Sequence, residues 1–366
     1  MAGSSYGTIF RITTWGESHG PALGVVIDGC PAGLPLSEAD IQPYLNRRKP
    51  GQSAISTPRK EDDAVEILSG VFEGRTTGTP ISLIVRNTSQ RSGDYSEIAS
   101  YYRPGHADYT FDQKYGFHDY RGGGRSSGRE TVGRVAAGAV AAKLLKEMGI
   151  TVTAYTRSIG PVEADLTHFD RSAILTTPTA MPDAAASQRA QTYLANLMSQ
   201  SDSAGGVMEC LVEGLPAGIG DPVFEKLDAN LGKALLSIGA VKAVEIGDGT
   251  AVSAKKGSEN NDAFRMQAGA VTKTSNHAGG ILGGISDGSP LLIRAHVKPT
   301  PSIFHPQKTV NKEGQDITVQ IKGRHDPVIV PRAVVVMESM VAITLLDALM
   351  LNMSAKAEDL ISFYKK

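Results

Sequence analysis

Residues 29–33, Gly-Cys-Pro-Ala-Gly, return as residues 214–218, Gly-Leu-Pro-Ala-Gly, at an offset of 185 positions. The same offset relates Ser-His-Gly at 18–20 to Ser-Ala-Gly at 203–205. Peptides that recur at one fixed offset indicate an internal repeat, although two copies are too few for a solenoid. If the repeat is real, only the first copy carries the histidine of this tripeptide.

Two further echoes follow in the same order along the chain. Residues 74–81 resemble residues 284–291 at an offset of 210, and the predicted helix after Arg125 loosely resembles the one after Arg324. Chance similarity among turns rich in glycine and proline is the alternative explanation. Forty glycines stand in separate clusters between apolar runs, where they allow tight turns or a close approach of the backbone to a ligand.

The order of the echoes predicts a single domain, residues 1–366, made of two weakly related halves at about 1–150 and 200–366. Residues 164–203 are rich in Ala, Thr, Ser and Asp and are interpreted as a connector, with a helix over 184–198. Alternating apolar runs predict strands, and periodic ones predict helices that begin at Ser37 and Ser127. We therefore expect an α+β fold.

Composition excludes several classes of protein. A net charge of -1, with 41% hydrophobic and 20% charged residues, is typical of a soluble globular protein and lacks the basic excess of a nucleic-acid binder. Two cysteines, Cys30 and Cys210, indicate a reducing cytoplasm rather than a disulfide framework. The N-terminus has no signal-peptide pattern, and we expect neither a membrane span nor a membrane partner.

Residues 120–130, Tyr-Arg-Gly-Gly-Gly-Arg-Ser-Ser-Gly-Arg-Glu, are the most informative local motif. A glycine-rich loop enters a predicted helix N-terminus, where free N–H groups and the helix dipole favour an anion. Arg125, Arg129 and Arg134 supply guanidinium groups that can bind phosphate through two hydrogen bonds. The motif is neither a Walker A loop nor a dinucleotide-binding turn. Phosphate binding is favoured over the alternative, a basic loop on the surface.

Four other polar residues are candidates for a site. His19 and His106 each lie beside glycine in a predicted turn, which suits a ring that must meet a ligand. Asp326 is a further acid–base candidate, and Arg48 belongs to a basic helix end that is more often only solvated. No histidine pair has the spacing of a zinc enzyme, so we expect no metal site. These residues predict an enzyme that acts on a phosphorylated small molecule.

Several motifs together resemble the chorismate synthases. They are Gly-Glu-Ser-His-Gly at 16–20, Arg-Pro-Gly-His-Ala-Asp at 103–108, the loop at 119–127, Ser-Asn-His-Ala-Gly-Gly-Ile-Leu-Gly-Gly at 275–284 and Gly-Arg-His-Asp-Pro at 323–327. They span nearly the whole chain in family order. The resemblance implies a β-α-β sandwich with a helical layer between antiparallel sheets, usually assembled as a cytoplasmic homotetramer.

The resemblance also implies an activity. It is the 1,4-anti elimination of phosphate from 5-enolpyruvylshikimate 3-phosphate (EPSP), which yields chorismate in the shikimate pathway of aromatic amino acid biosynthesis. The family requires reduced FMN although the reaction causes no net redox change. Some members also reduce their own flavin with NADPH, and that bifunctional form is the alternative. A protein that only binds the phosphorylated ligand is a second alternative, which an acid–base set of two histidines and an aspartate disfavours.

Position by position, the resemblance assigns three catalytic residues. His19 matches the histidine that protonates the departing phosphate, His106 the one beside the pyrimidine end of the flavin, and Asp326 the aspartate near flavin N5. Arg48, Arg129 and Arg134 are assigned to the substrate. Flavin contacts are implied for Arg125, Ser126, Ser127, Gly239, Ala240, Gly283, Lys298, Pro299, Thr300, Pro301, Ser302 and Arg324.

The sequence departs from the family pattern at two of these regions. Ala54 stands where many members have an arginine that helps to hold an anion. Loss of one charge-assisted hydrogen bond costs roughly 1.5–3 kcal/mol, so we predict weaker substrate binding rather than lost activity. Gly239 stands where asparagine is common, which removes a side-chain contact to the flavin.

Overall fold

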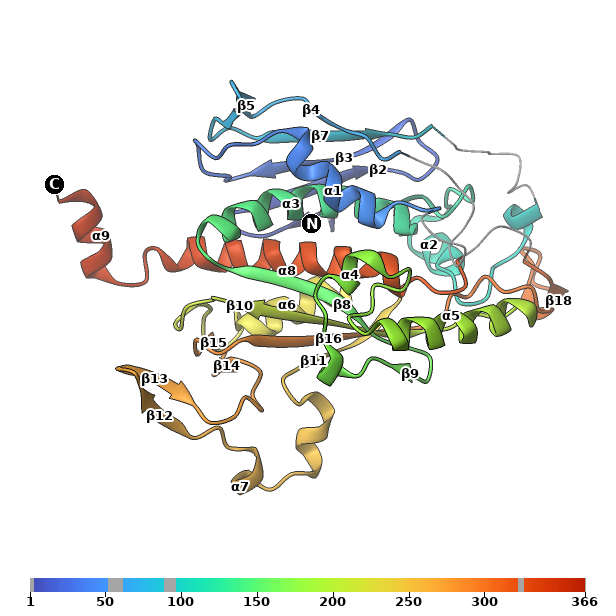
Figure 1. The fold of residues 1–366 in the computed structure, drawn as a ribbon. Coiled ribbons are helices and arrows are strands. Elements are labelled where there is room, and N and C mark those ends of the chain that lie inside the picture. The colour runs from blue at the N-terminus through green and yellow to red at the C-terminus, as the bar shows by residue number, and fades with distance from the viewer. Residues whose placement is uncertain (1–2, 52–61, 89–96, 322–325, 366) are drawn as a thin grey trace.

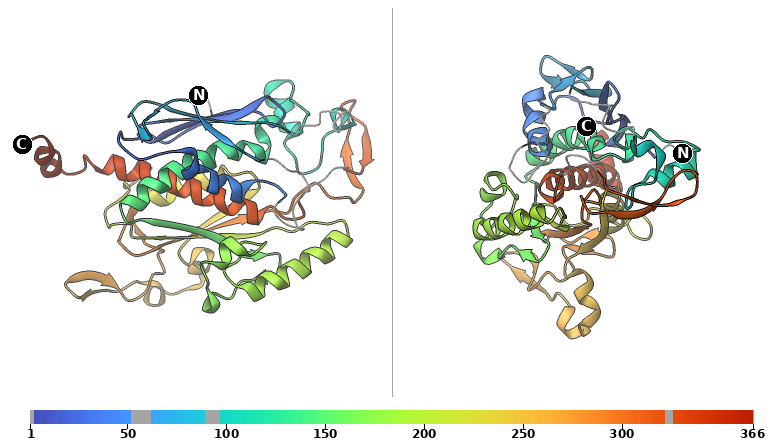
Figure 2. Two further views of the ribbon diagram at one scale, coloured as in Figure 1. Left: turned by 45° about the horizontal axis from the view of Figure 1, so that its top comes forward. Right: turned by 90° about the vertical axis from the view of Figure 1, so that its right-hand side faces the viewer.

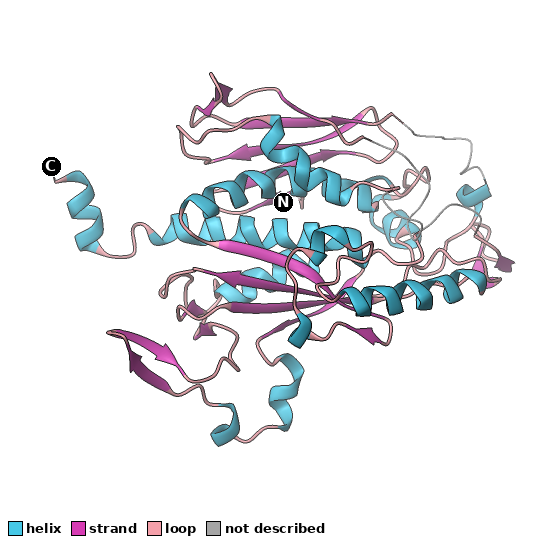
Figure 3. Cartoon of the chain, in the orientation of Figure 1, coloured by secondary structure: helices cyan, strands magenta, loops and turns pink. Residues whose placement is uncertain are grey.

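Two five-stranded antiparallel sheets enclose a layer of helices, and Figure 1 shows the three layers edge-on. This computed structural model describes residues 3–51, 62–88, 97–321 and 326–365. The helices of the central layer and the strands of the two sheets occupy separate layers, as the colouring in Figure 3 shows. The predicted α+β architecture, with helices between antiparallel sheets, is confirmed.

The first sheet has the order β1-β2-β3-β7-β4. In β7 the side chains of Ile81, Leu83 and Val85 are buried in alternation, so one face of this sheet packs on the helices. The strands are β1 (Ser5–Tyr6), β2 (Arg11–Gly16), β3 (Ala22–Asp28), β4 (Val65–Ile67) and β7 (Ile81–Arg86).

The second sheet has the order β11-β16-β10-β8-β9. In β16 alternate residues from Leu291 to Val297 are buried, which places the apolar face of this sheet against the opposite side of the helical layer. The strands are β8 (Thr151–Ile159), β9 (Val162–Glu163), β10 (Gly206–Glu213), β11 (Val241–Ile246) and β16 (Leu291–Val297).

The helical layer consists of α1 (Glu38–Arg48), α3 (Thr131–Glu147), α6 (Leu227–Leu236) and α8 (Val330–Asn352). Helices covered by a sheet on one side and by neighbours on the others should be apolar nearly all round. In α8 every residue from Val334 to Asp347 is buried. Gly138 of α3 lets that helix approach α8 closely, because a Cβ there would lie 2.2 Å from the Cβ of Ser339.

Helix α8 is by length and composition apolar enough to cross a membrane, but 72% of its apolar window is buried inside the protein. Its two acidic residues hold it in the core. Asp347 accepts hydrogen bonds from the backbone N–H groups of Thr8 (2.9 Å), Ile9 (2.7 Å) and Phe10 (3.0 Å). Glu338 pairs with Arg47 at 2.7 Å. We interpret α8 as the central helix of the core.

The two sheets repeat one topology. In the first sheet, the strands that come in the chain order β2, β3, β4 and β7 lie side by side in the order β2-β3-β7-β4. Strands β8, β10, β11 and β16 likewise lie in the order β8-β10-β16-β11. Each set has a helix between its second and third strands, α1 in one and α6 in the other, and a long helix after its fourth, α3 and α8.

The echoing peptides make equivalent hydrogen bonds. Gly33 N–H donates to the carbonyl of Thr76 (2.8 Å), and Gly218 N–H donates to that of Ser286 (2.8 Å). The Thr76 hydroxyl donates to Pro31 O at 2.6 Å, and the Ser286 hydroxyl donates to Pro216 O at 2.6 Å. The residues that recur in sequence therefore form the same turn in each half.

The remaining elements lie around the three layers. Helix α5 (Ala184–Ser199) confirms the helix predicted for the connector, and α9 (Ala357–Tyr364) extends away from the body in the left view of Figure 2. The other helices are α2 (Asp108–Tyr115), α4 (Ala173–Thr176) and α7 (Gly257–Asn260). The short strands are β5 (Val71–Phe72), β6 (Arg75–Thr76), β12 (Phe264–Gln267), β13 (Ala270–Lys273), β14 (Ile281–Leu282), β15 (Ile285–Ser286), β17 (Gln307–Val310) and β18 (Asp316–Val319).

One predicted helix start is right and the other is wrong in detail. Ser37 caps α1 and its N–H is bonded by Asp40 (2.8 Å), as the sequence predicts. Ser127 caps only a short 3-10 turn, and α3 begins at Thr131. The carboxylate of Glu130 does not close a capping box, because it accepts hydrogen bonds from Thr14 (2.9 Å) and Arg134 (2.9 Å) instead.

Candidate active site

The loop between β2 and β3 carries His19, which is buried with 9% of its surface exposed. Its Nδ1 lies 3.0 Å from the hydroxyl oxygen of Ser18. That hydroxyl also lies within hydrogen-bond distance of the Gly122 carbonyl, at 3.3 Å. The glycine-rich loop of residues 120–130 is therefore in contact with His19, although a hundred residues separate the two in sequence.

Gly122 gives the imidazole its room. Its φ of +69° lies in the left-handed region, and a Cβ at this position would lie 2.2 Å from Cε1 of His19. A side chain here would be strained and would also displace the ring. The glycine that the sequence predicts for a phosphate-binding loop thus also leaves room for the imidazole ring of His19.

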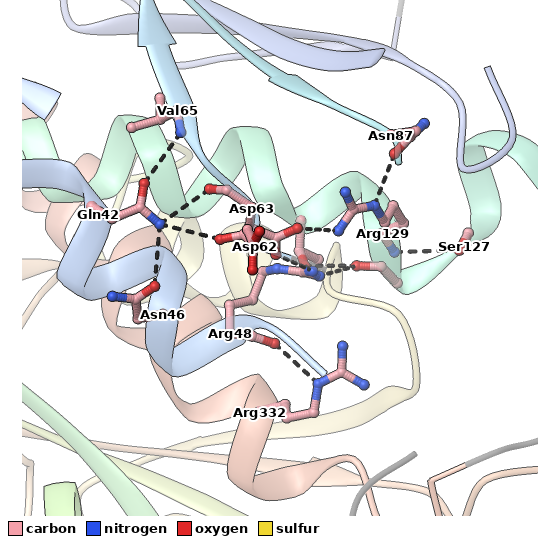
Figure 4. Close-up of polar contacts among 12 residues, drawn as sticks. Gln42, Asn46, Arg48, Asp62, Asp63, Val65, Asn87, Ser127, Arg129 and Arg332 are labelled. Carbon is pink, nitrogen blue, oxygen red and sulfur yellow. Dashed lines mark hydrogen bonds and ion pairs between the residues drawn. The ribbon is translucent and has the colours of Figure 1, made fainter. Parts of the chain in front are cut away.

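A buried carboxylate holds two of the arginines assigned to the substrate. Asp63 binds Arg48 at 2.8 Å through one oxygen and Arg129 through the other. Both arginines come from the helical layer, Arg48 from the last turn of α1 and Arg129 from the turn before α3, and Figure 4 shows them converging on Asp63. Asp63 is not evident from the sequence, because nothing near it in the chain indicates its partners.

The charges in this cluster shift one another. The pKa of Arg48 is lowered to about 10, chiefly by burial, with Arg332 and Arg129 also lowering it and Asp63 raising it. Burial alone would raise the pKa of Asp63, but Arg48 and Arg129 outweigh it and the pKa of that carboxyl is lowered. Two guanidinium groups around one carboxylate leave one positive charge, which favours an anionic ligand.

The turn that presents Asp63 is held by α1. Asp63 has a φ of +48°, which is uncommon for a residue other than glycine. The Gln42 side chain donates to the Asp63 carbonyl (3.2 Å) and accepts from the N–H of Val65 (3.2 Å), as drawn in Figure 4. The left-handed turn is thus fixed on both sides before β4 begins.

Asp326 joins the same cluster through Arg332. Arg332 is a second residue of this cluster that is not evident from the sequence. Arg332 forms an ion pair with Asp326 and donates through Nε to the backbone carbonyl of Arg48 at 3.0 Å. Asp326 is 8% exposed. The first turn of α8 therefore connects the predicted acid–base aspartate to the predicted substrate arginine.

His106 lies in a second group of contacts. Its Nε2 is 2.9 Å from the hydroxyl of Ser302, and its Nδ1 is 3.0 Å from the carbonyl of Pro104. Lys298 donates through Nζ to the Gly105 carbonyl at 2.7 Å. The segments 103–108 and 298–302, both predicted to meet the flavin, are therefore side by side.

A buried ion pair closes the loop that carries His106. Arg103 binds Asp108 through two nitrogens, at 2.8 Å and 2.7 Å, and both side chains are buried. Burial would raise the pKa of Asp108, but the Arg103 guanidinium outweighs it and lowers that pKa. A bidentate pair of this kind fixes the geometry of the turn between its two residues.

Three more predicted residues border these groups. Arg134 donates to the hydroxyl of Ser237 (2.6 Å), just before Gly239 and Ala240, and the Ala240 carbonyl accepts from Lys298 N–H at 2.9 Å. Arg125 points instead to β2, where it donates to Thr14 Oγ1 at 2.8 Å and to the Gly16 carbonyl at 3.2 Å. Its guanidinium therefore supports the strand that leads to His19.

The remaining predicted residues have less defined surroundings. Ser126 donates to the Gly123 carbonyl at 2.7 Å, and Gly283 forms the turn between β14 and β15. Arg324 and Ala54 lie outside the described residues. In the described ranges no group of three His, Cys, Asp or Glu side chains is arranged to hold a metal ion.

Comparisons with known proteins identify the family. Residues 10–350 match the family model described as chorismate synthase. A chorismate synthase of Agathobacter rectalis is 64% identical over 366 residues, which cover 100% of both chains. A chorismate synthase of Chloroflexus aggregans is 52% identical over 351 residues, which cover 96% of both chains. A crystal structure of chorismate synthase superposes with a TM-score of 0.77 at 31% identity, and covers 98% of this chain and 97% of that one. The chain belongs to the chorismate synthase family and is a lyase.

Proposed function

We propose that this enzyme eliminates phosphate from EPSP to give chorismate, with reduced FMN and without net redox change. In a 1,4-anti elimination the C6–H and C3–O bonds break, a second ring double bond forms, and phosphate and a proton leave. The observation that carries the proposal is the hydrogen-bonded set that links the His19 loop, Arg129, Asp63, Arg48 and Asp326. It combines a proton donor, anion binders and a second proton carrier.

His19 is the group we assign to the departing phosphate. Its Nδ1 faces the Ser18 hydroxyl, so we assign the transferred proton to Nε2. A charged imidazole stabilises the phosphate dianion as it forms, and proton transfer then completes the departure. Arg48 and Arg129 are already oriented by Asp63, so they can bind the substrate's anionic groups without first finding their geometry.

The residues fit a phosphate-bearing cofactor. Segments 103–108, 237–240 and 298–302 converge through hydrogen bonds of their backbones and side chains, with Arg134 and Lys298 as cations. Among the described residues, the buried hydroxyl of Thr300 has no hydrogen-bond partner, which a ligand here would satisfy. When bound, reduced FMN supplies a transient electron to the substrate. His106 would stand at the pyrimidine end of the flavin, and Asp326 would accept and pass a proton near N5.

The alternative is a bifunctional enzyme that reduces its own FMN with NADPH. No dinucleotide-binding fingerprint supports it, so we propose a monofunctional enzyme supplied with reduced flavin in the cytoplasm. The deciding experiment is an anaerobic assay with EPSP and either photoreduced FMN, oxidised FMN, or oxidised FMN plus NADPH. We expect chorismate only with photoreduced FMN. Product with oxidised FMN and NADPH would establish the bifunctional form, and no product in any mixture would remove the proposal.

We further propose a homotetramer. Apolar side chains are exposed on α9, including Leu360, Ile361 and Phe363, and on the β12–β13 hairpin, including Met266 and Val271. Apolar surface exposed together on one element is typical of an interface between chains. Light scattering on a size-exclusion column should give about four times the 38.6 kDa mass of one chain. A single-chain mass at micromolar concentration would contradict the tetramer.

A further inference from the structure

The side chain of Asn87, just after β7, has hydrogen bonds on both its nitrogen and its oxygen. Its Nδ2 donates to the carbonyls of Gly20 (2.7 Å) and Glu17 (3.1 Å). Its Oδ1 accepts from Nε of Arg129 at 3.0 Å, a contact visible in Figure 4. The amide thus joins the loop that carries His19 to the arginine held by Asp63.

The backbone strengthens this attachment to the loop. Asn87 N–H donates to the carbonyl of Pro21 at 3.1 Å. Immediately before it, Arg86 of β7 pairs with Ala22 of β3 in the sheet register. The His19 loop therefore rests on the end of β7 at several points, and Asn87 is the residue through which that support reaches the arginines.

Arg129, which Asn87 joins to the His19 loop, is also held in place. Arg129 is paired with Asp63, whose side chain is 0% exposed, and Asp63 also pairs with Arg48. Without the amide of Asn87, Arg129 would keep its carboxylate partner, but the His19 loop would lose two side-chain hydrogen bonds. The spacing between the loop and the arginines would then rest on the Ser18 and Pro21 contacts.

We propose that Asn87 is a positioning residue that fixes His19 relative to Arg129. This inference rests on the proposed function, in which His19 protonates the phosphate that the arginines bind. Proton transfer needs a donor and acceptor within hydrogen-bond reach, and a displacement of about 1 Å can reduce the rate about a hundredfold. Asn87 touches no reacting atom in this account and acts only through the two groups that it joins.

Asparagine suits this role because one side chain must donate twice and accept once. An aspartate of the same shape could still accept from Arg129, but it has no N–H for the carbonyls of Gly20 and Glu17. Asn87→Asp therefore separates the two functions of the residue. It keeps the arginine in place and releases the loop, with little change in volume.

The test compares kcat and KM for EPSP with reduced FMN in wild type, Asn87→Asp and a control. Asn196→Asp makes the same charge change on the exposed part of α5. We expect Asn87→Asp to lower kcat about ten- to hundredfold, because His19 is displaced. KM should also rise, because the added carboxylate beside Arg129 cancels the net positive charge of the cluster, so the fall in kcat is the result that bears on positioning. Asn196→Asp should match wild type in both constants. Thermal unfolding of each variant checks that the protein is folded.

A double-mutant cycle with His19→Ala distinguishes positioning from general support. If Asn87 acts by placing His19, Asn87→Asp should change kcat by less than about twofold once the histidine is absent. An equal loss in both backgrounds, or a rise in KM without a fall in kcat, would overturn the inference. If His19→Ala leaves too little activity for the cycle, the division between kcat and KM in the single variant decides. Loss of chorismate formation in wild type would instead refute the proposed function.

Discussion

The ring of His19 lies so close to Gly122 that even one methyl group there would collide with it. Gly122→Ala should therefore lower kcat at least tenfold, because the ring must move and the residue must keep a left-handed conformation. Gly149→Ala is the matched control. Gly149 has a φ of +76° and open space around it, so that variant shares the backbone strain and spares the site. Equal kcat values in the two variants would contradict the claim that Gly122 leaves the room that the His19 ring needs.

Asp63 should contribute more to stability than a surface carboxylate. Asp63→Asn leaves two buried guanidinium groups without their charged partner, and we expect a loss of about 3–5 kcal/mol in the free energy of unfolding. Asparagine tolerates the left-handed φ of this position, so charge is the main change. Glu66→Gln removes a carboxylate from an exposed pair with Arg86 and should cost less than about 1 kcal/mol. Urea unfolding measures both, and similar losses would contradict the prediction.

Some of these residues could be predicted from sequence and others could not. His19, His106 and the arginines around residues 120–130 were found because glycine and basic residues cluster locally. Asp63 and Asn87 were not, because their side-chain partners lie between 15 and 70 positions away in the chain. Only the pairing of β4 and β7 within the first sheet brings them beside α1 and the turn before α3. Arg125 was predicted as a flavin contact, yet its guanidinium bonds β2, and that prediction stays untested.

At the scale of elements, α3 approaches α8 closely at Gly138. Gly138→Ala would place its Cβ 2.5 Å from Cα of Ser339, which forces the backbones apart. We expect it to destabilise by about 1–3 kcal/mol. Gly232→Ala on α6 meets nothing within 4 Å and should stabilise by up to about 1 kcal/mol through helix propensity. Shifts of the same sign in the two melting temperatures would contradict this view of the helical layer.

Element boundaries show where local sequence signals fail. The motif Ser127 to Glu130 has the composition of a capping box, but Thr14 and Arg134 compete for the Glu130 carboxylate and the helix starts at Thr131. At α1 the tertiary partner Lys143 pairs with Oδ1 of Asp40 and leaves Oδ2 to accept from the N–H of Ser37, and the helix begins after Ser37 as predicted. A capping motif is thus decided by tertiary partners that the sequence does not reveal.

For the whole molecule, we propose that the two halves arose from one duplicated unit. The shared strand order and the matching bonds of Thr76 and Ser286 support it. In the second half Ala204 takes the place of His19, and its N–H donates to the Pro327 carbonyl (2.9 Å), beside Asp326. The duplicated unit would then have kept an imidazole on one side of the site and gained a carboxylate on the other.

The pH dependence of stability follows from the buried carboxylates. Asp63 and Asp108 have pKa values lowered in the folded protein by their arginine partners, so they contribute stability above the unfolded value of about 3.9. That contribution is lost as pH falls through the folded pKa values, because unfolding then takes up protons. The melting temperature should drop below about pH 4, and less steeply in Asp63→Asn. A pH-independent melting temperature between pH 6 and pH 3 would contradict this.

The measurement that tests the central claim most directly is the stoichiometry of the reaction under anaerobic conditions. Purified protein is mixed with excess EPSP and a small amount of photoreduced FMN, and chorismate, phosphate and the flavin spectrum are followed together. We predict one chorismate and one phosphate for each EPSP consumed, over many turnovers, with the flavin still reduced at the end. Product limited to one equivalent of the reduced flavin, or phosphate released without chorismate, would contradict the account.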